Sequence, residues 1–338
     1  MSRATSGEST TPVVAALGSG PAAASLAAYA RWRWWELALL AVAALSWFVL
    51  PGHALLLNEV AILALFALSL DLVLGYAGIV SLGQAAYFGF GAYVAALFAK
   101  HLMPDPLIGL AVAVMASTLL GLATSLLILR GSDLTRLMVT LGIASILYEL
   151  ANRLDWLTGG ADGLQGVLMG PLLGRFEFDL YGRTAYAYSL VVLLAALLFC
   201  RRLANSPFGV SLKALRDNPL RAASVGLSVP RRVVAAYTVG AGIAGAAGAL
   251  LAQTAGFASL DVLEFHRSAD VLLMLVIGGA GYLYGGLIGA VAFKLLHDAI
   301  SILTPQYWTF WLGLFLVVLV LVGRERLVRP WTWFGSRR

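Results

Sequence analysis

Long apolar runs separated by short polar stretches dominate this chain. The runs are about 16 to 24 residues long, and an α-helix needs about 20 apolar residues to cross the hydrocarbon core of a bilayer. We therefore predict an all-α polytopic membrane protein with about ten transmembrane segments, some of them broken by glycines. The predicted segments cover residues 36–51, 55–74, 78–99, 106–129, 135–152, 185–200, 233–255, 269–283, 286–303 and 308–323. Glycines crowd the junction of the eighth and ninth segments, where a short or broken helix is expected.

Composition excludes a soluble protein. Hydrophobic residues make up 60% of the chain and charged residues only 12%, whereas soluble domains carry about 25% charged residues. The single cysteine, Cys200, can form no internal disulfide and offers no metal-ligand spacing. Segment 233–255 contains Gly240, Gly242, Gly245 and Gly248, a spacing that favours close helix packing by small residues over a dinucleotide-binding turn.

Basic residues gather in four polar places, which predicts the orientation in the membrane. They are the segment 201–232, the C-terminal tail, the loop 130–136, and the two arginines Arg31 and Arg33 before the first span. All four places should be cytoplasmic. Ten spans with both termini inside satisfy these placements and put the loop 154–184 outside. We expect a disordered tail over residues 1–30, a transmembrane domain over 31–330 and a cytoplasmic tail over 331–338. The first apolar run would act as a signal anchor.

One apolar run is interrupted by polar side chains and glycines, and it is the first candidate for a functional site. Non-helical backbone at membrane depth is tolerated when it is buried in protein or lines a watery cavity, and broken helices can hold polar solutes. The alternative is glycine-mediated packing with a kink. Asp71 is a functional candidate or a carboxylate near the membrane edge that accepts hydrogen bonds from the broken backbone. The predicted path residues are Asp71, Gly75, Tyr76, Gly78, Ser81, Gly83, Gln84 and Tyr87.

Two further observations concern charged pairs and an outer loop. Glu149 with Arg153, and Lys294 with Asp298, are spaced four apart and can close on one helix face. The glycine-rich loop 157–166 contains the second candidate set, which could contact a solute or an external protein, or could be a plain exposed turn. Its residues are Thr158, Gly159 and Gly160.

The basic segment 205–232 is the third candidate. Pro207 and Gly209 open it, and Asn218-Pro219 predicts a helix stop followed by a capped new helix that ends at Gly226. Two short helices at the membrane surface would result. They could rest on anionic lipid headgroups, or their regularly spaced leucines could fit a groove in a partner protein.

No constellation in the sequence supports catalysis. The chain has no phosphate-binding loop, no His/Cys metal cluster and no Ser/His/Asp arrangement, so we predict no catalytic residue and no metal. The net charge of +6 lies in loops and does not indicate nucleic-acid binding. If transport consumes ATP, another chain hydrolyses it.

Four blocks of the sequence resemble the permease subunit of branched-chain amino-acid ABC importers, the LivM-like family. They are GYAGIVSLGQAAYFGFGAY at 75–93, LTGG at 157–160, ALRDNPLRAASVGL at 214–227 and SADVLLMLVIGGAG at 268–281. The resemblance implies an importer permease in a bacterial inner membrane that works with a second, LivH-like permease, two cytoplasmic ATPases and an external solute-binding protein. ATP and magnesium would bind the partner subunits, and this chain would bind no cofactor.

The same resemblance implies that segment 216–226 is the helix that couples the permease to an ATPase. Arg221 stands where a small residue is usual, the glutamate of the general importer loop is missing, and Asp71 stands where asparagine is common. The solute is expected to be a branched-chain or related amino acid; an ion-coupled secondary transporter or channel is the alternative. The expected coupling residues are Leu212, Leu215, Arg216, Asp217, Asn218, Pro219, Arg221, Ala222 and Gly226.

Overall fold

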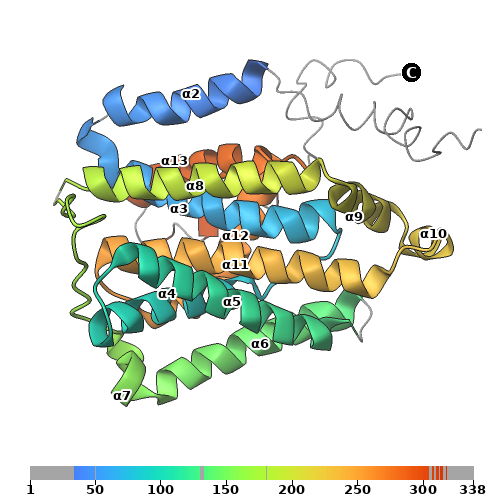
Figure 1. The fold of residues 1–338 in the computed structure, drawn as a ribbon, viewed down its shortest axis with the longest axis horizontal. Helices are drawn as coiled ribbons and strands as arrows, with labels where there is room; N and C mark the ends of the chain where they lie inside the picture. The colour runs from blue at the N-terminus through green and yellow to red at the C-terminus, as the bar shows by residue number, and fades with distance from the viewer. Residues whose placement is uncertain are drawn as a thin grey trace, which may run out of the picture.

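The protein is a helical bundle (Figure 1). The computed structural model describes residues 34–49, 51–129, 133–179 and 181–303, together with 307, 310, 311, 313, 314 and 317. Over these residues the main helices are α2 (Trp34–Val49), α3 (Ala54–Leu70), α4 (Gln84–His101), α5 (Pro106–Ile128), α6 (Asp133–Arg153), α7 (Asp155–Thr158), α8 (Arg183–Ala204), α9 (Pro207–Asp217), α10 (Pro219–Ser224), α11 (Val229–Ala255), α12 (Phe265–Gly278) and α13 (Gly285–Leu303). No strand is present in this part of the chain, where pairing is limited to two isolated bridges.

Six of the described helices are long and apolar enough to cross a membrane, and with the composition they make this a multi-pass membrane protein. They are α5, α6, α8, α11, α13 and the continuous helix of α3 with its extension to Tyr76. Helices α2, α4 and α12 coincide with three more predicted segments but are shorter or less apolar, with 16, 18 and 14 residues. The total of about ten spans therefore stays a prediction, and most of segment 308–323 lies outside the described residues, as do both predicted tails.

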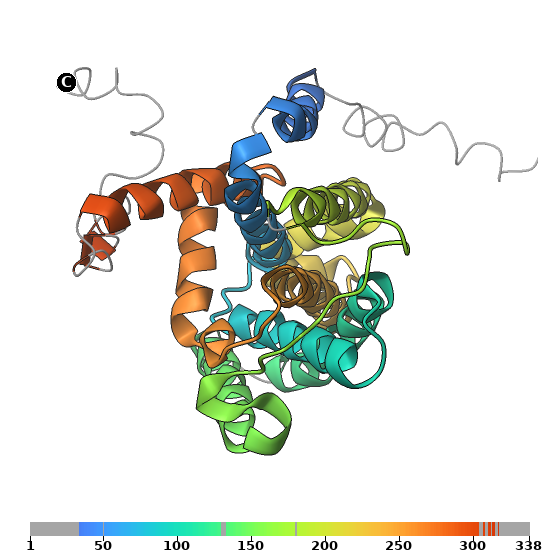
Figure 2. The ribbon, with the colours of Figure 1, turned by 90° about the vertical axis from the view of Figure 1, so that its left-hand side faces the viewer.

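Burial identifies the centre of the bundle. Each of the six long helices contains an apolar stretch of 18 residues. In this stretch, 72% of the residues are buried in the α3 helix and 78% in α11, but only 17% in α6. Figure 2 looks along the bundle and shows α3 and α11 between the other helices, with α12 and α13 lying across their direction. Apolar side chains on the outer helices are exposed, which fits a lipid surface.

Small residues let the central helices approach closely, as the sequence predicted. A Cβ added to Gly248 of α11 would overlap the backbone of Phe88 in α4, and one added to Gly245 would overlap Ser117 of α5. Buried polar groups are paired across helices: Ser189 Oγ donates to Asn58 Oδ1 at 2.6 Å, and Asn58 Nδ2 donates to Thr254 Oγ1 at 3.1 Å. Such contacts replace water as hydrogen-bond partners within a membrane.

The basic segments meet at one end of the bundle. Helices α9 and α10, the end of α5, the start of α6 and the start of α11 lie together at the right of Figure 1. The start of α2 joins the same end, because Arg201 Nη2 at the end of α8 pairs with Glu36 Oε2 at 2.9 Å. The described parts next to three of the four segments that positive charge predicts to be cytoplasmic thus share one end of the bundle, and the C-terminal tail lies outside the described residues.

Candidate functional site

The first element of the candidate site is a break between α3 and α4. The predicted third segment, 78–99, has the wrong start, because residues 77–83 are not helical and α4 begins only at Gln84. A wide π-helical turn over Asp71–Tyr76 precedes the break, and such turns are frequent at functional sites. Gly78 has a φ of 72°, a left-handed conformation that glycine adopts without strain.

A second break, between α12 and α13, lies against the first. Gly279 and Gly281 have positive φ values of 99° and 82°. The Gly281 backbone N–H donates a hydrogen bond of 2.7 Å to Asp71 Oδ1, which joins positions 210 residues apart in the sequence. Asp71 is fully buried, and its Oδ2 has no hydrogen-bond partner among the described residues. A Cβ at Gly75 would overlap both the Asp71 carboxylate and the Gly281 nitrogen, so this contact requires glycine.

Helix α9 covers the two breaks from the basic end of the bundle. Leu212 and Leu215 are buried, which fixes α9 on the bundle by one apolar face. Arg216 Nη1 then donates a hydrogen bond of 2.7 Å to the Gly75 carbonyl oxygen, and Lys213 Nζ lies 5.3 Å from the centre of the Tyr76 ring. The Gly75 carbonyl oxygen, which lies at the break, therefore accepts its hydrogen bond from a cationic side chain of α9.

Helix α10 projects beyond α9 and is less tightly held. Asn218 Oδ1 accepts from the Arg221 N–H at 2.9 Å, with Pro219 at the first helical position, so the predicted capped restart is confirmed. Ala222 is buried, whereas Leu220 and Val225 are 82% and 78% exposed. Asp217 and Arg221 are exposed and Gly226, with a φ of 89°, ends the turn. The tip therefore presents apolar side chains among polar ones.

The other predicted path residues lie inside the bundle. Gln84 Nε2 donates to Ser69 Oγ at 3.1 Å, and the Tyr87 hydroxyl shares a hydrogen bond of 2.8 Å with Thr124 Oγ1. Ser81 is fully buried and accepts from the Gly83 N–H at 3.4 Å. Tyr76 is also buried. These residues therefore gather around the first break, and their role in lining a path stays a prediction.

The outer-loop candidates form an ordered turn. Thr158 is buried and its hydroxyl donates to the carbonyl oxygens of Ala151, at 2.5 Å, and Leu154, at 2.9 Å. Gly159 and Gly160 both have positive φ, and Leu164 pairs with Ala258 in an antiparallel bridge. The loop thus supports the segment that leads into α12, at the end of the bundle opposite α10.

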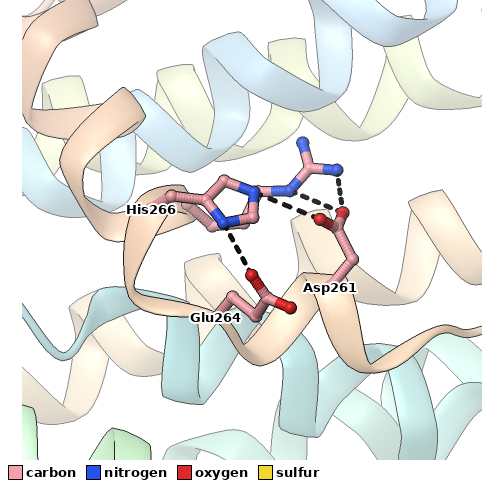
Figure 3. Close-up of polar contacts among 4 residues, drawn as sticks. Asp261, Glu264 and His266 are labelled. Carbon is pink, nitrogen blue, oxygen red and sulfur yellow. Dashed lines mark hydrogen bonds and ion pairs between the residues drawn. The ribbon is translucent and has the colours of Figure 1, made fainter. Parts of the chain in front are cut away.

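That opposite end holds a charged cluster that the sequence analysis missed. His266 lies between two carboxylates, with Nε2 at 3.1 Å from Asp261 Oδ1 and Nδ1 at 2.9 Å from Glu264 Oε2, and Arg267 pairs with Asp261 (Figure 3). On α13, Lys294 Nζ pairs with Asp298 at 3.0 Å, as the spacing predicted, and also with Glu59 of α3 at 2.6 Å. The predicted Glu149–Arg153 pair is present too, at 2.6 Å.

These features define a class: a helical membrane protein with two broken helices tied to a basic surface segment. Sequence comparison specifies it. Residues 52–323 match the family described as "Branched-chain amino acid transport system / permease component", so the chain belongs to that family. As a member, it is an ABC-type permease, LivM-like, that works with other subunits.

Individual relatives agree with this assignment. The chain is 30% identical to the high-affinity branched-chain amino acid transport system permease protein LivM of Salmonella typhimurium over 87% of its own length and 74% of the relative's. It is also 30% identical to LivM of Escherichia coli, over 88% and 75%. A probable LivH of Methanocaldococcus jannaschii is 26% identical over 71% and 77%. No solved structure matches the chain.

Proposed function

We propose that this chain is the membrane permease subunit of an ATP-driven importer for branched-chain or related amino acids. Its relatives LivM of Salmonella typhimurium and Escherichia coli carry that solute class in their names. Its partners would be a second, LivH-like permease, two ATPase subunits that bind ATP and magnesium, and an external solute-binding protein. The complex would sit in a bacterial inner membrane with both termini of this chain in the cytoplasm.

One observation carries the mechanism: the hydrogen bond from Arg216 of α9 to the Gly75 carbonyl oxygen in the first break. An ATPase that moves α9 and α10 would pull on Gly75 through this bond, and on α12–α13 through the bond between Asp71 and Gly281. Both broken helices would then shift together. Coupling of this kind needs an element with two arrangements that both sites bias, and in this proposal the paired breaks would be that element.

The exposed tip of α10 supports the same proposal. Exposed Leu220 lies on α10, which extends away from the bundle, and exposed Val225 follows directly after the end of that helix. Apolar side chains in such a position fit a groove on a soluble partner better than a lipid headgroup layer, since a groove removes them from water. We assign this surface, together with Arg221, to the ATPase contact.

Reconstitution tests the proposal. The chain is co-expressed with a LivH-like permease and two ATPases, purified, placed in proteoliposomes with the binding protein, and assayed for uptake of L-leucine. We expect uptake only with ATP and the complete set of subunits. Uptake by this chain alone, driven by a proton or sodium gradient, would instead support an ion-coupled secondary transporter.

A further inference from the structure

A cavity of about 370 Å³ opens at the end of the bundle opposite α10. This volume lies within the range of small-molecule sites. Three helices each contribute a face to it: Glu59, Ile62, Leu63 and Phe66 recur at helical spacing on α3, and Arg267, Asp270 and Met274 do so on α12, while Phe293, Lys294 and His297 come from α13. All the residues that line the cavity belong to this chain.

The walls are of two kinds. Ile62, Phe66, Phe88, Leu251 and Met274 form an apolar part, in which the Phe66 and Phe88 rings lie 4.5 Å apart between centres. Charged side chains and two histidines form the rest, so that a ligand would meet both hydrocarbon and ions. Charges at membrane depth are unfavourable unless they are functional or paired, so a charged group of this wall that has no ion-pair partner is a candidate for a function.

Within the described residues, one carboxylate in this wall stands apart from the ion pairs. Glu59 pairs with Lys294, and Asp261 pairs with Arg267. Asp270 accepts no hydrogen bond and joins no ion pair within this part of the chain, although Arg267 is among the charged groups that act on it. It is available to accept hydrogen bonds from a ligand ammonium group.

The cations of the wall keep donors for an anion. An ammonium group has three N–H donors, and Lys294 uses two of them on Glu59 and Asp298. Arg267 has five donors and directs Nε and Nη2 to Asp261. If the ammonium group of a ligand lies at Asp270, Lys294 or Arg267 could therefore donate hydrogen bonds to the carboxylate of that ligand without breaking an existing ion pair.

We propose that this cavity is a binding site for a zwitterionic amino acid, with Asp270 receiving the ammonium group, Lys294 and Arg267 the carboxylate, and Phe66, Phe88 and Met274 the apolar side chain. This inference rests on the proposed import function and adds a site within the permease. The floor of the cavity adjoins the two breaks: Phe66 precedes Asp71 by five residues and Met274 precedes Gly278 by four, about 6 to 8 Å along a helix. Movement of the breaks by α9 would change the floor.

The site can be tested by protection of an introduced thiol. The native Cys200 is fully buried, so a Leu63→Cys variant places one reactive thiol on the cavity wall of the assembled transporter. Leu168→Cys, on a loop where Leu168 is 81% exposed, is the matched control. We expect millimolar L-leucine to slow labelling of Leu63→Cys by a maleimide and to leave Leu168→Cys unchanged.

Ligand analogues and Asp270 variants decide the chemistry. 4-Methylpentanoate lacks the ammonium group and isoamylamine lacks the carboxylate, so each should protect at least about tenfold less well than leucine, as loss of a charge-assisted hydrogen bond implies. Asp270→Asn should weaken leucine protection by a similar factor, whereas Glu264→Gln, a carboxylate outside the cavity wall, should not. If Asp270→Asn fails to fold, the role of Asp270 is tested in two other ways. One is the Asp270→Glu variant, and the other is the series of leucine analogues on the protein that retains Asp270.

The outcomes separate this inference from the proposed function. ATP-dependent leucine uptake by the Leu63→Cys transporter with no protection by leucine, or with equal protection by all three compounds, overturns the site and leaves the import function standing. Equal protection in Asp270→Asn and its parent also overturns it. Labelling blocked regardless of leucine would indicate a lipid occupant and contradict the proposal, and absence of uptake in the native transporter would contradict the import function itself.

Discussion

The Arg216 guanidinium donates a hydrogen bond of 2.7 Å to the carbonyl oxygen of Gly75, across 141 residues of sequence. The donor lies on a basic surface helix, and the acceptor is a backbone group released by a break in a buried helix. A charge-assisted bond to a freed carbonyl is stronger than a neutral one. It makes α9 part of the broken-helix junction, so displacement of α9 must be felt there.

The junction should tolerate no side chain at Gly75. A Gly75→Ala substitution places a methyl group on the Asp71 carboxylate and the Gly281 nitrogen, and overpacking of this kind costs about 1–3 kcal/mol. We expect a lower melting temperature in detergent and loss of uptake. Gly142→Ala is the control, because a Cβ at Gly142 of α6 meets nothing within 4 Å. A Gly75→Ala protein as stable and as active as this control would refute the packing argument.

The α10 tip should be required for ATPase binding but not for folding. Leu220→Asp puts a charge where an exposed leucine is proposed to enter a groove, so the ATPases should no longer co-purify with the permease, while its melting temperature stays unchanged. Leu168→Asp alters a side chain of nearly equal exposure, 81% against 82%, at the other end of the molecule. It should leave co-purification intact. Retention of the ATPases by Leu220→Asp would remove α10 from the contact.

The ion pair between Glu36 and Arg201 should stabilise the attachment of α2. Both side chains are buried, with exposures of 11% and 12%, and removing one partner of such a pair costs about 3–5 kcal/mol because the other charge is left buried. Glu36→Gln should therefore unfold at a clearly lower temperature. In a double-mutant cycle with Arg201→Gln, the double variant should lose less than the sum of the two single changes. Additive losses would show that the pair contributes nothing.

Sequence patterns predicted local features well and distant contacts poorly. Apolar length located most helices, and the Asn218-Pro219 punctuation placed α10, because both depend on neighbouring residues. The helix break was expected near Gly75, but the hydrogen bond from Gly281 to Asp71 was not, since no local signal links positions so far apart. The charged cavity was missed for the same reason: Glu59, Asp270 and Lys294 come from three helices. The two glycine clusters, Gly75 to Gly83 and Gly278 to Gly286, were the available hint in the sequence.

The central claim is that α9 controls the broken helices through Arg216. The direct measurement is ATP-dependent leucine uptake, alongside ATP hydrolysis, by the reconstituted transporter carrying Arg216→Glu, with Arg231→Glu as a control on an exposed arginine of the same basic segment. A glutamate would repel the Gly75 carbonyl. The account predicts that Arg216→Glu inserts and assembles normally but loses uptake and the stimulation of ATPase activity by the binding protein, while Arg231→Glu retains both. Normal uptake by Arg216→Glu would contradict it.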